Sequence, residues 1–484
     1  MIRAAPILEA PVKPDGLSHR DYLVMLLHTA AELEHGLMVE YLYAAYSLGG
    51  PGAEKTDAIS KKVARWRDAL LTIAREEMGH LLTVENALML VGGPISFDRR
   101  AYPWTSRFYP FPFRLEPFSL KSLARYVYAE MSPSYVSSGE KAAQMLERLK
   151  IIDDTIKAKM TSGWRVGVVY EAILELAADR TKIPDETFDA GSLRFQATWD
   201  EWGRGYRPEP HKPYAKDPAH PNDPPPYARK TRVIVASMAT RTELLNALTD
   251  LASQGEGETR ADDRREPSHF DRFVEIFDEY VKLHSDDPHW SPARPLPSNP
   301  VVDKHKEFLV EGITEITAPE SRHWASLFNL RYRILLSMLT YTYRVSREAN
   351  PMSDLRRAPM LARVFGEMYN LKAIAGVLVR LPLTADPTSP LRAGPPFELA
   401  YSRTLPAPEA NFWRMQLDLI DGSRELAEQL LRVPPATNTP ADGDGARYLT
   451  ALLEADSASR TWIEKRLEGL APGPASRGSK GKRS

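Results

Sequence analysis

Two carboxylates and an imidazole lie close together in an otherwise apolar stretch of the sequence, at Glu76, Glu77 and His80. Charged side chains are costly to bury unless a partner compensates them, so their position in a predicted apolar helix needs an explanation. Glu77 and His80 are three residues apart and therefore share a helix face. One helix can then offer a carboxylate and an imidazole to the same ion, as in helical bundles that hold a pair of metal ions.

A further carboxylate lies in the preceding predicted helix, at Glu34, with Tyr41 seven residues later. Seven residues are about two helical turns, so both side chains lie on one stripe of that helix. In the alternative interpretation, Glu32, Glu34 and Glu40 form a solvated edge and Tyr41 belongs to the core. That alternative suits Glu32 and Glu40, but Glu34 lies close to the apolar stripe of the helix. The stripe consists of Leu27, Ala30, Leu37, Met38 and Tyr41.

Two histidines share this helix with Glu34. His35 is its direct neighbour, but successive helical residues point about 100° apart, which argues against joint binding of one ion. His28, six residues before Glu34, is a candidate for the shell behind the ligands.

The composition restricts the ligands and the partners. The chain has no cysteine, so any metal must be held by oxygen and nitrogen. Its 63 basic and 64 acidic residues give a net charge of −1, which offers no field for nucleic acid or an anionic membrane. We expect a cytoplasmic protein whose partners are small molecules or other proteins, because the sequence shows neither a secretory signal nor a membrane-spanning run. A homo-oligomer is compatible with this composition.

Apolar residues recur at helical spacing over two long stretches, 22–48 and 57–92. An aromatic and proline-rich segment, 95–118, follows them and is predicted to be a structured covering loop. Further helices are predicted over 120–129, 138–159 and 164–178, and a last bundle helix in two pieces over 240–253 and 268–283.

The pattern predicts an all-α protein in which a four-helix bundle occupies residues 15–285. Proline is dense between 181 and 235, which indicates an extended insertion into this bundle. A second all-helical region is expected over 303–471, and the Gly, Ser, Lys and Arg residues of 473–484 are predicted to form a flexible tail. The helices of the second region are predicted at about 303–315, 322–347, 353–379, 407–433 and 444–470.

At this point the sequence resembles a known family. Glu34 followed by Tyr41 resembles the first-helix pattern of bacterioferritin, and Glu76-Glu77-Met78-Gly79-His80 resembles its second-helix motif. The surrounding residues are more similar still to the ferritin-like domain of the iminophenyl-pyruvate dimer synthases of violacein-type biosynthesis. That similarity covers about residues 15–283. It rests on Leu33-Glu34-His35, Tyr41-Leu42, Glu77-Met78-Gly79-His80, Asn86, Gly92-Gly93-Pro94, Gln254-Gly255-Glu256-Gly257 and Ser268-His269-Phe270-Asp271-Arg272-Phe273.

The resemblance implies a ferritin-like bundle and a role for several residues. Glu34 would be the terminal carboxylate of the first helix, Glu77 a bridging carboxylate and His80 an imidazole ligand, with Tyr41 as a catalytic residue.

The second half of such a site needs a carboxylate from the third helix and another Glu and His pair from the fourth. In the third helix we expect Glu171, with Glu175 as the alternate. In the fourth we expect His269 with either Glu266 or Glu256. Pro267 favours a first helical turn, so that Glu266 can also be a helix cap, whereas glycines flank Glu256 and let the backbone approach a metal.

By resemblance, the cofactor would be two iron ions, with manganese as the alternative, since carboxylates and imidazoles without thiolates suit both. The pair would react with dioxygen or peroxide and oxidise a small organic metabolite, an amino-acid-derived or aromatic nitrogen compound. Two other functions use the same residues: a ferroxidase or peroxide-detoxifying protein that handles iron, and a scaffold in which buried Glu and His residues only hydrogen-bond to one another. The long insertion and the second helical region favour a substrate pocket or a partner surface over iron handling.

Overall fold

The computed structural model describes residues 12–106, 108–131, 148, 150–151, 165–202, 233–256, 267–303, 311–347, 354–399, 404–432 and 443–470. Over these residues the chain is mainly helical, which confirms the predicted all-α class. Within them, no helix is both long enough and apolar enough to cross a membrane.

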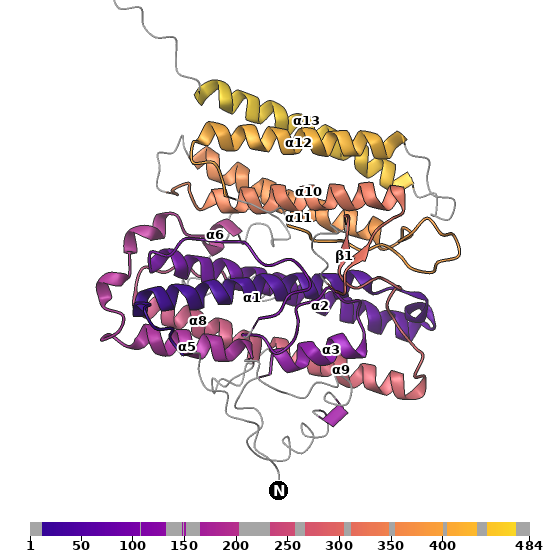
Figure 1. Cartoon of the computed structure of the whole chain (residues 1–484), viewed down its shortest axis with the longest axis horizontal. Coiled ribbons are helices and arrows are strands. Elements are labelled where there is room, and N and C mark those ends of the chain that lie inside the picture. The colour runs from indigo at the N-terminus through magenta and orange to yellow at the C-terminus, as the bar shows by residue number, and fades with distance from the viewer. Residues whose placement is uncertain are drawn as a thin grey trace, which may run out of the picture.

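Two long antiparallel helices form the centre of the molecule, α1 (His19–Ser47) and α2 (Asp57–Leu90), joined by the short helix η1 (Pro51–Glu54). Each begins at a hydroxyl side chain that accepts a backbone N–H of the first turn, Ser18 for α1 and Thr56 for α2. The two helices pack along most of their length (Figure 1). They match the two long helices predicted from the apolar periodicity.

In its described residues, the other half of the bundle consists of four shorter helices: α3 (Leu120–Ala129), α5 (Val166–Ala178), α8 (Arg241–Glu256) and α9 (His269–Asp286). α5 packs against α8, and α3 packs against α9, so both the third and the fourth bundle positions are divided into two pieces. All four lie beneath α1 and α2 in Figure 1. The division of the fourth position agrees with the prediction; the use of α3 in the third position was not predicted. Most of the helix predicted over 138–159 lies outside the described residues.

Three short helical turns follow α5 in the region predicted as an insertion. They are η3 (Asp185–Thr187), η4 (Ala190–Arg194) and α6 (Trp199–Trp202). Residues 203–232, which include most of the prolines of this insertion, are outside the described part.

The described part of the C-terminal region contains four long helices: α10 (Pro319–Thr342), α11 (Asp354–Leu378), α12 (Glu409–Arg432) and α13 (Gly443–Leu470). They stack above α1 and α2 in Figure 1, and Arg331 of α10 forms a buried ion-pair cluster with Glu367 of α11 and Asp456 of α13. The helix predicted over 303–315 is wrong at its described end, which contains the strand β2 (Thr314–Glu315), paired in parallel with β1 (Pro300–Val301). Residues 304–310 lie outside the described part. The left-handed backbone of Gly312 makes the turn into β2, and helices do not tolerate that conformation.

The two helical layers share a continuous apolar core. Polar contacts also join them: the hydroxyl of Tyr332 in α10 pairs with Nε2 of His35 in α1, and Tyr343 donates to the carbonyl of Leu82 at 3.3 Å. His35 therefore points toward α10, in agreement with its predicted separation from Glu34. The division into two domains at 285 and 303 stays a prediction.

The aromatic segment 95–118 covers one side of α1. The backbones of Trp104 and Phe113 exchange two hydrogen bonds, of 3.2 and 2.8 Å, and the two rings stack. Phe113 lies directly against Gly36, where a Cβ atom would come within 2.7 Å of the ring. A glycine at position 36 is therefore needed for the segment to approach the helix this closely.

Candidate metal centre

Five buried side chains from four helical segments converge inside the bundle. α1 contributes Glu34, α2 contributes Glu77 and His80, the residue that ends α3 is Glu130, and α9 begins with His269. They form two groups of potential ligands, Glu34 with Glu77 and His80, and Glu77 with Glu130 and His269. Within each group the ligand atoms lie within 4.8 Å of one another.

Glu77 belongs to both groups, and each of its oxygens faces a different histidine. Oε2 lies 2.9 Å from Nδ1 of His80, and Oε1 lies 2.9 Å from Nδ1 of His269. The two imidazole rings are nearly parallel, with centroids 5.4 Å apart. The terminal carboxylates are slightly farther away, Glu34 at 3.4 Å from His80 Nδ1 and Glu130 at 4.0 Å from His269 Nδ1. Glu77 is thus the one side chain that the two groups of potential ligands share.

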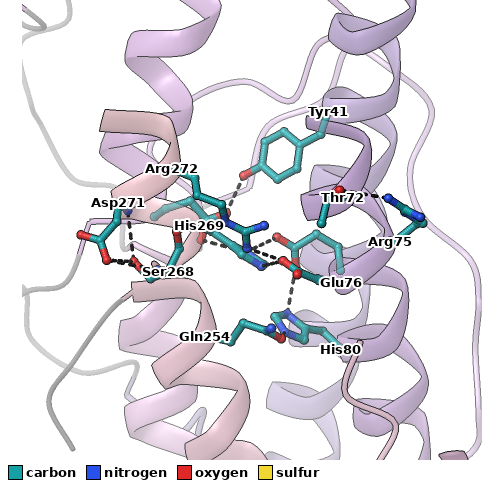
Figure 2. Close-up of polar contacts among 12 residues, drawn as sticks. Tyr41, Thr72, Arg75, Glu76, His80, Gln254, Ser268, His269, Asp271 and Arg272 are labelled. Carbon is teal, nitrogen blue, oxygen red and sulfur yellow. Dashed lines mark hydrogen bonds and ion pairs between the residues drawn. The ribbon is translucent and has the colours of Figure 1, made fainter. Parts of the chain in front are cut away.

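The second ring nitrogen of each histidine, Nε2, contacts a polar side chain outside the cluster (Figure 2). Nε2 of His80 lies 2.9 Å from Oε1 of Gln254 in α8, and Nε2 of His269 lies 3.0 Å from Oε2 of Glu76. Glu76 also forms an ion pair with Arg272 of α9. An acceptor at Nε2 fixes the proton there and leaves Nδ1 to face the cluster, which is how metal-binding histidines are commonly oriented.

Each terminal carboxylate also receives a hydrogen bond from a tyrosine. Tyr41 donates to Oε1 of Glu130 at 2.5 Å, and Tyr170 of α5 donates to Oε1 of Glu34. A carboxylate with one oxygen occupied by such a donor keeps the other oxygen for an ion. Tyr41, predicted as a catalytic residue, thus contacts a potential ligand and does not itself belong to either group.

Burial and mutual repulsion raise the pKa of Glu34 to about 8 and that of Glu130 to about 7, because both lie near the charge of Glu77. Burial also disfavours the charged form of Glu77, but the charges of His269 and His80 hold its pKa well below the usual range. Burial opposes protonation of His269 as well, but Glu77 and Glu76 raise the pKa of His269 to about 9. Without a cation, the cluster therefore retains protons that a metal ion would displace.

The residues fit a metal pair on a further ground. Oε2 of Glu34 and Nδ1 of His269 are buried and make no hydrogen bond of good geometry to any described residue, although His269 Nδ1 lies close to Glu77. Buried polar atoms are rarely left without a partner, and both of these atoms point into the cluster. The set of oxygen and nitrogen donors suits iron or manganese.

A small cavity of about 20 Å³ adjoins the cluster. That volume is sufficient for about one water molecule. Besides the five potential ligands, its wall consists of Leu37, Val166, Tyr170, Leu251, Ala252 and Gly255. A Cβ atom at position 255 would lie 3.3 Å from Oε2 of Glu130, so Gly255 leaves space for that carboxylate.

The structure brings together four of the residues predicted as ligands, Glu34, Glu77, His80 and His269. It does not bring Glu171 or Glu175 to them, because both side chains lie on the exposed side of α5.

Tyr170 is the residue of α5 that points inward, and a neighbour about 100° farther around the helix cannot also do so. Glu130 supplies the carboxylate expected of the third helix. Glu130 directly follows a buried apolar stretch, 126–129. A single carboxylate at the end of such a stretch is the sequence signal that could have identified Glu130 as a candidate ligand. Glu266 lies outside the described residues, and Glu256 ends α8 with a side chain that is also outside them.

Comparisons with known proteins identify the family of the bundle. The sequence model of a family described as Ferritin-like matches residues 27–278. The dichlorochromopyrrolate synthase of Lentzea aerocolonigenes is 25% identical over 431 residues, which cover 81% of this chain and 38% of the relative. The 2-imino-3-(indol-3-yl)propanoate dimerase of Chromobacterium violaceum is 25% identical over 401 residues, which cover 77% of this chain and 33% of the relative. The chain thus spans little more than a third of the length of these curated relatives. No solved structure matches it significantly.

Proposed function

Because this chain belongs to the ferritin-like family, we propose that it is a di-metal oxidoreductase that uses dioxygen or peroxide to oxidise a small organic metabolite. The observation that carries the proposal is the position of Glu77 between two sets of ligand atoms, with one oxygen toward each histidine. A simple hydrogen bond between a glutamate and one histidine would use only one carboxylate oxygen, whereas Glu77 uses both. The metal is iron or manganese.

Glu34, Glu77 and His80 would hold one ion, and Glu77, Glu130 and His269 the other. When bound, the metal pair supplies the electrons that reduce dioxygen or peroxide. The protein contributes fixed ligand positions, through Gln254 and Glu76 behind the histidines and the tyrosines behind the carboxylates. Leu37, Val166, Leu251 and Ala252 line the cavity beside the cluster, and Tyr41 donates a hydrogen bond to Glu130.

The substrate class is inferred from the relatives. One is named for an imine of an indole-bearing acid and the other for a chlorinated chromopyrrolate. Both names denote aromatic nitrogen compounds. We extend this class to the present chain and propose that its substrate is an amino-acid-derived or aromatic nitrogen metabolite.

Metal analysis tests the proposal directly. Protein purified without a chelator, or reconstituted with ferrous iron, should contain about two iron or manganese ions per chain. The variant Glu77→Ala should lose most of the metal at both positions. The control Glu171→Ala, which removes an exposed carboxylate, should retain both ions. Zinc alone, or no metal after iron loading, would contradict the proposal and support a scaffold of hydrogen-bonded Glu and His residues.

One observation favours a second function, iron oxidation or peroxide removal. The cavity of about 20 Å³ beside the cluster has room for about one water-sized molecule and is too small for an organic metabolite. Oxygen uptake by the ferrous protein separates the two functions. Uptake that continues when indole or imine compounds and a reductant are supplied supports organic oxidation; uptake that stops once the bound iron is oxidised, whatever is added, supports iron handling.

A further inference from the structure

A second cavity lies where the bundle meets the C-terminal layer. Its volume is about 490 Å³, which is within the range of small-molecule sites in proteins. The end of α2, the turn η4 and the end of α10 form its walls. Met89 of α2 lines the cavity nine residues beyond His80, so this wall lies about 14 Å along the helix from the metal centre. None of the five potential metal ligands borders it.

Hydrogen bonds fix the walls of this cavity to one another. The backbone N–H of Asp189, which precedes η4, donates to the carbonyl of Leu90 at the end of α2, at 2.7 Å. Arg357 of α11 is buried and donates to the carbonyls of Phe195 at 3.1 Å and of Thr342 at 2.7 Å. Arg357 thereby joins the residue after η4 to the end of α10. The cavity is therefore preformed, and a ligand would need to order little of the protein when it binds.

Two guanidinium groups line the cavity, those of Arg194 and Arg344, and both residues are exposed to solvent. Within the described part of the chain, neither forms an ion pair with a carboxylate. Arg194 lies over the ring of Phe195, 4.9 Å from its centroid, and Arg344 donates to a backbone carbonyl of the segment before α12 at 2.9 Å. The carboxylate of Asp189 also lines the cavity, but it accepts the N–H of Gly191 at 2.9 Å within its own turn. The lining side chains thus carry a net positive charge.

Apolar and aromatic side chains provide much of the remaining wall. They are Met89 and Ile95 from the bundle side, Phe195 after η4, and Tyr343, which is buried at the end of α10. Guanidinium groups bind carboxylates through charge-assisted hydrogen bonds, and an apolar wall favours a ring over a chain of water molecules. This combination suits an organic anion with an aromatic body better than an inorganic ion.

We propose that this cavity binds a small aromatic carboxylate, with the carboxylate at Arg194 and Arg344. The ring lies against Met89, Ile95 and Tyr343. This inference goes beyond the proposed function, because the site is separate from the metal centre and needs no metal ion. No bond is made or broken there.

The experiment titrates the full chain, freed of metal by a chelator, with 3-(indol-3-yl)propionate and follows the probe by ligand-detected nuclear magnetic resonance. Removal of metal excludes binding of the probe carboxylate to an ion. We expect one molecule per chain with a Kd of about 1 mM or tighter. Indole, which lacks the carboxylate, and propionate, which lacks the ring, should each bind about tenfold more weakly or worse.

Variants locate the site. Arg194→Gln and Arg344→Gln should each weaken binding of the probe by about tenfold or more, because each removes a charge-assisted hydrogen bond. Arg432→Gln is the matched control: it removes a largely exposed guanidinium at the end of α12 and should leave the Kd unchanged. Met89→Trp fills the cavity while both guanidinium groups remain, and it should abolish binding. Melting temperatures establish that each variant is folded.

The outcomes separate this site from the metal centre. If the metal-free wild type shows no saturable binding up to about 5 mM probe, the site is wrong and the di-metal function is unaffected. Wild-type affinity in folded Arg194→Gln and Met89→Trp would also overturn it, as would equal weakening by Arg432→Gln, which would indicate general attraction to surface charge. If Arg344→Gln unfolds, the other two variants decide. A chain that binds the probe but takes up no metal would overturn the proposed function alone.

Discussion

The two acceptors behind the histidines allow the two halves of the metal centre to be perturbed separately. Glu76 contacts His269, whereas Gln254 contacts His80. Removing an outer-shell partner of a metal-binding histidine typically weakens metal affinity by about 10- to 100-fold. We therefore expect Glu76→Gln to weaken one binding step by about 1.4 to 2.7 kcal/mol and to leave the other nearly unchanged. Gln254→Leu should weaken the other step by a similar amount.

Glu76→Gln has a further effect on folding, because Glu76 is fully buried and paired with Arg272. Breaking a buried ion pair by removal of one partner costs about 3 to 5 kcal/mol when the remaining charge has no compensation. Arg272 is partly exposed, with 14% of its side chain accessible, and glutamine retains a hydrogen-bond acceptor. We expect a smaller loss, of about 1 to 3 kcal/mol in the free energy of unfolding of the metal-free protein.

The assay is an anaerobic titration of metal-free protein with manganous or ferrous ion, followed by calorimetry and fitted to two sites. Glu171→Gln serves as the control, because it makes the same chemical change on the exposed side of α5. The reasoning would be refuted if Glu76→Gln weakened both steps equally, or neither step, while the protein remained folded. Equal weakening would mean that the two ions do not divide between His80 and His269.

Three further predictions concern the ligands, the protons and the packing. Glu130→Ala should bind about one metal ion per chain, measured by elemental analysis, whereas binding of two would exclude Glu130 as a ligand. In the metal-free protein, His269 and Glu34 have pKa values raised from 6.5 to about 9 and from 4.5 to about 8. Their contribution to stability is fully present below the unfolded values and is lost by the time the pH has risen through the folded values. The melting temperature should therefore fall between about pH 5 and 9, and the fall should be absent once metal has displaced the protons. A glycine-to-alanine change inside a helix ordinarily stabilises it by about 0.5 to 1 kcal/mol. In Gly36→Ala the new methyl group would press on the ring of Phe113, so we expect the free energy of unfolding, measured by urea denaturation, to fall by about 1 to 3 kcal/mol. An increase would contradict the close packing of the covering segment on α1.

Local spacing in the sequence determined one half of the candidate site. Glu77 and His80 meet because residues three apart in any α-helix share a face. Glu34 was selected over Glu32 because it lies close to the apolar stripe of its helix. His269 followed from a family resemblance and is, as expected, at the start of the last bundle helix. The all-helical class was predictable from periodicity, whereas the ferritin-like family came from the resemblance of these few residues to known proteins.

Only the tertiary structure decided which other residues complete the cluster. Glu130 replaces the predicted Glu171, since α3 and α5 both contribute to the third bundle position and the inward face of α5 is occupied by Tyr170. The contacts of Gln254, Glu76 and Tyr41 join segments up to 193 positions apart in the chain, and no local pattern encodes them. Helical periodicity fixes directions within one helix, but the rotation and offset of one helix against another depend on packing of the whole core. The partners of a ligand therefore become visible only in the folded chain.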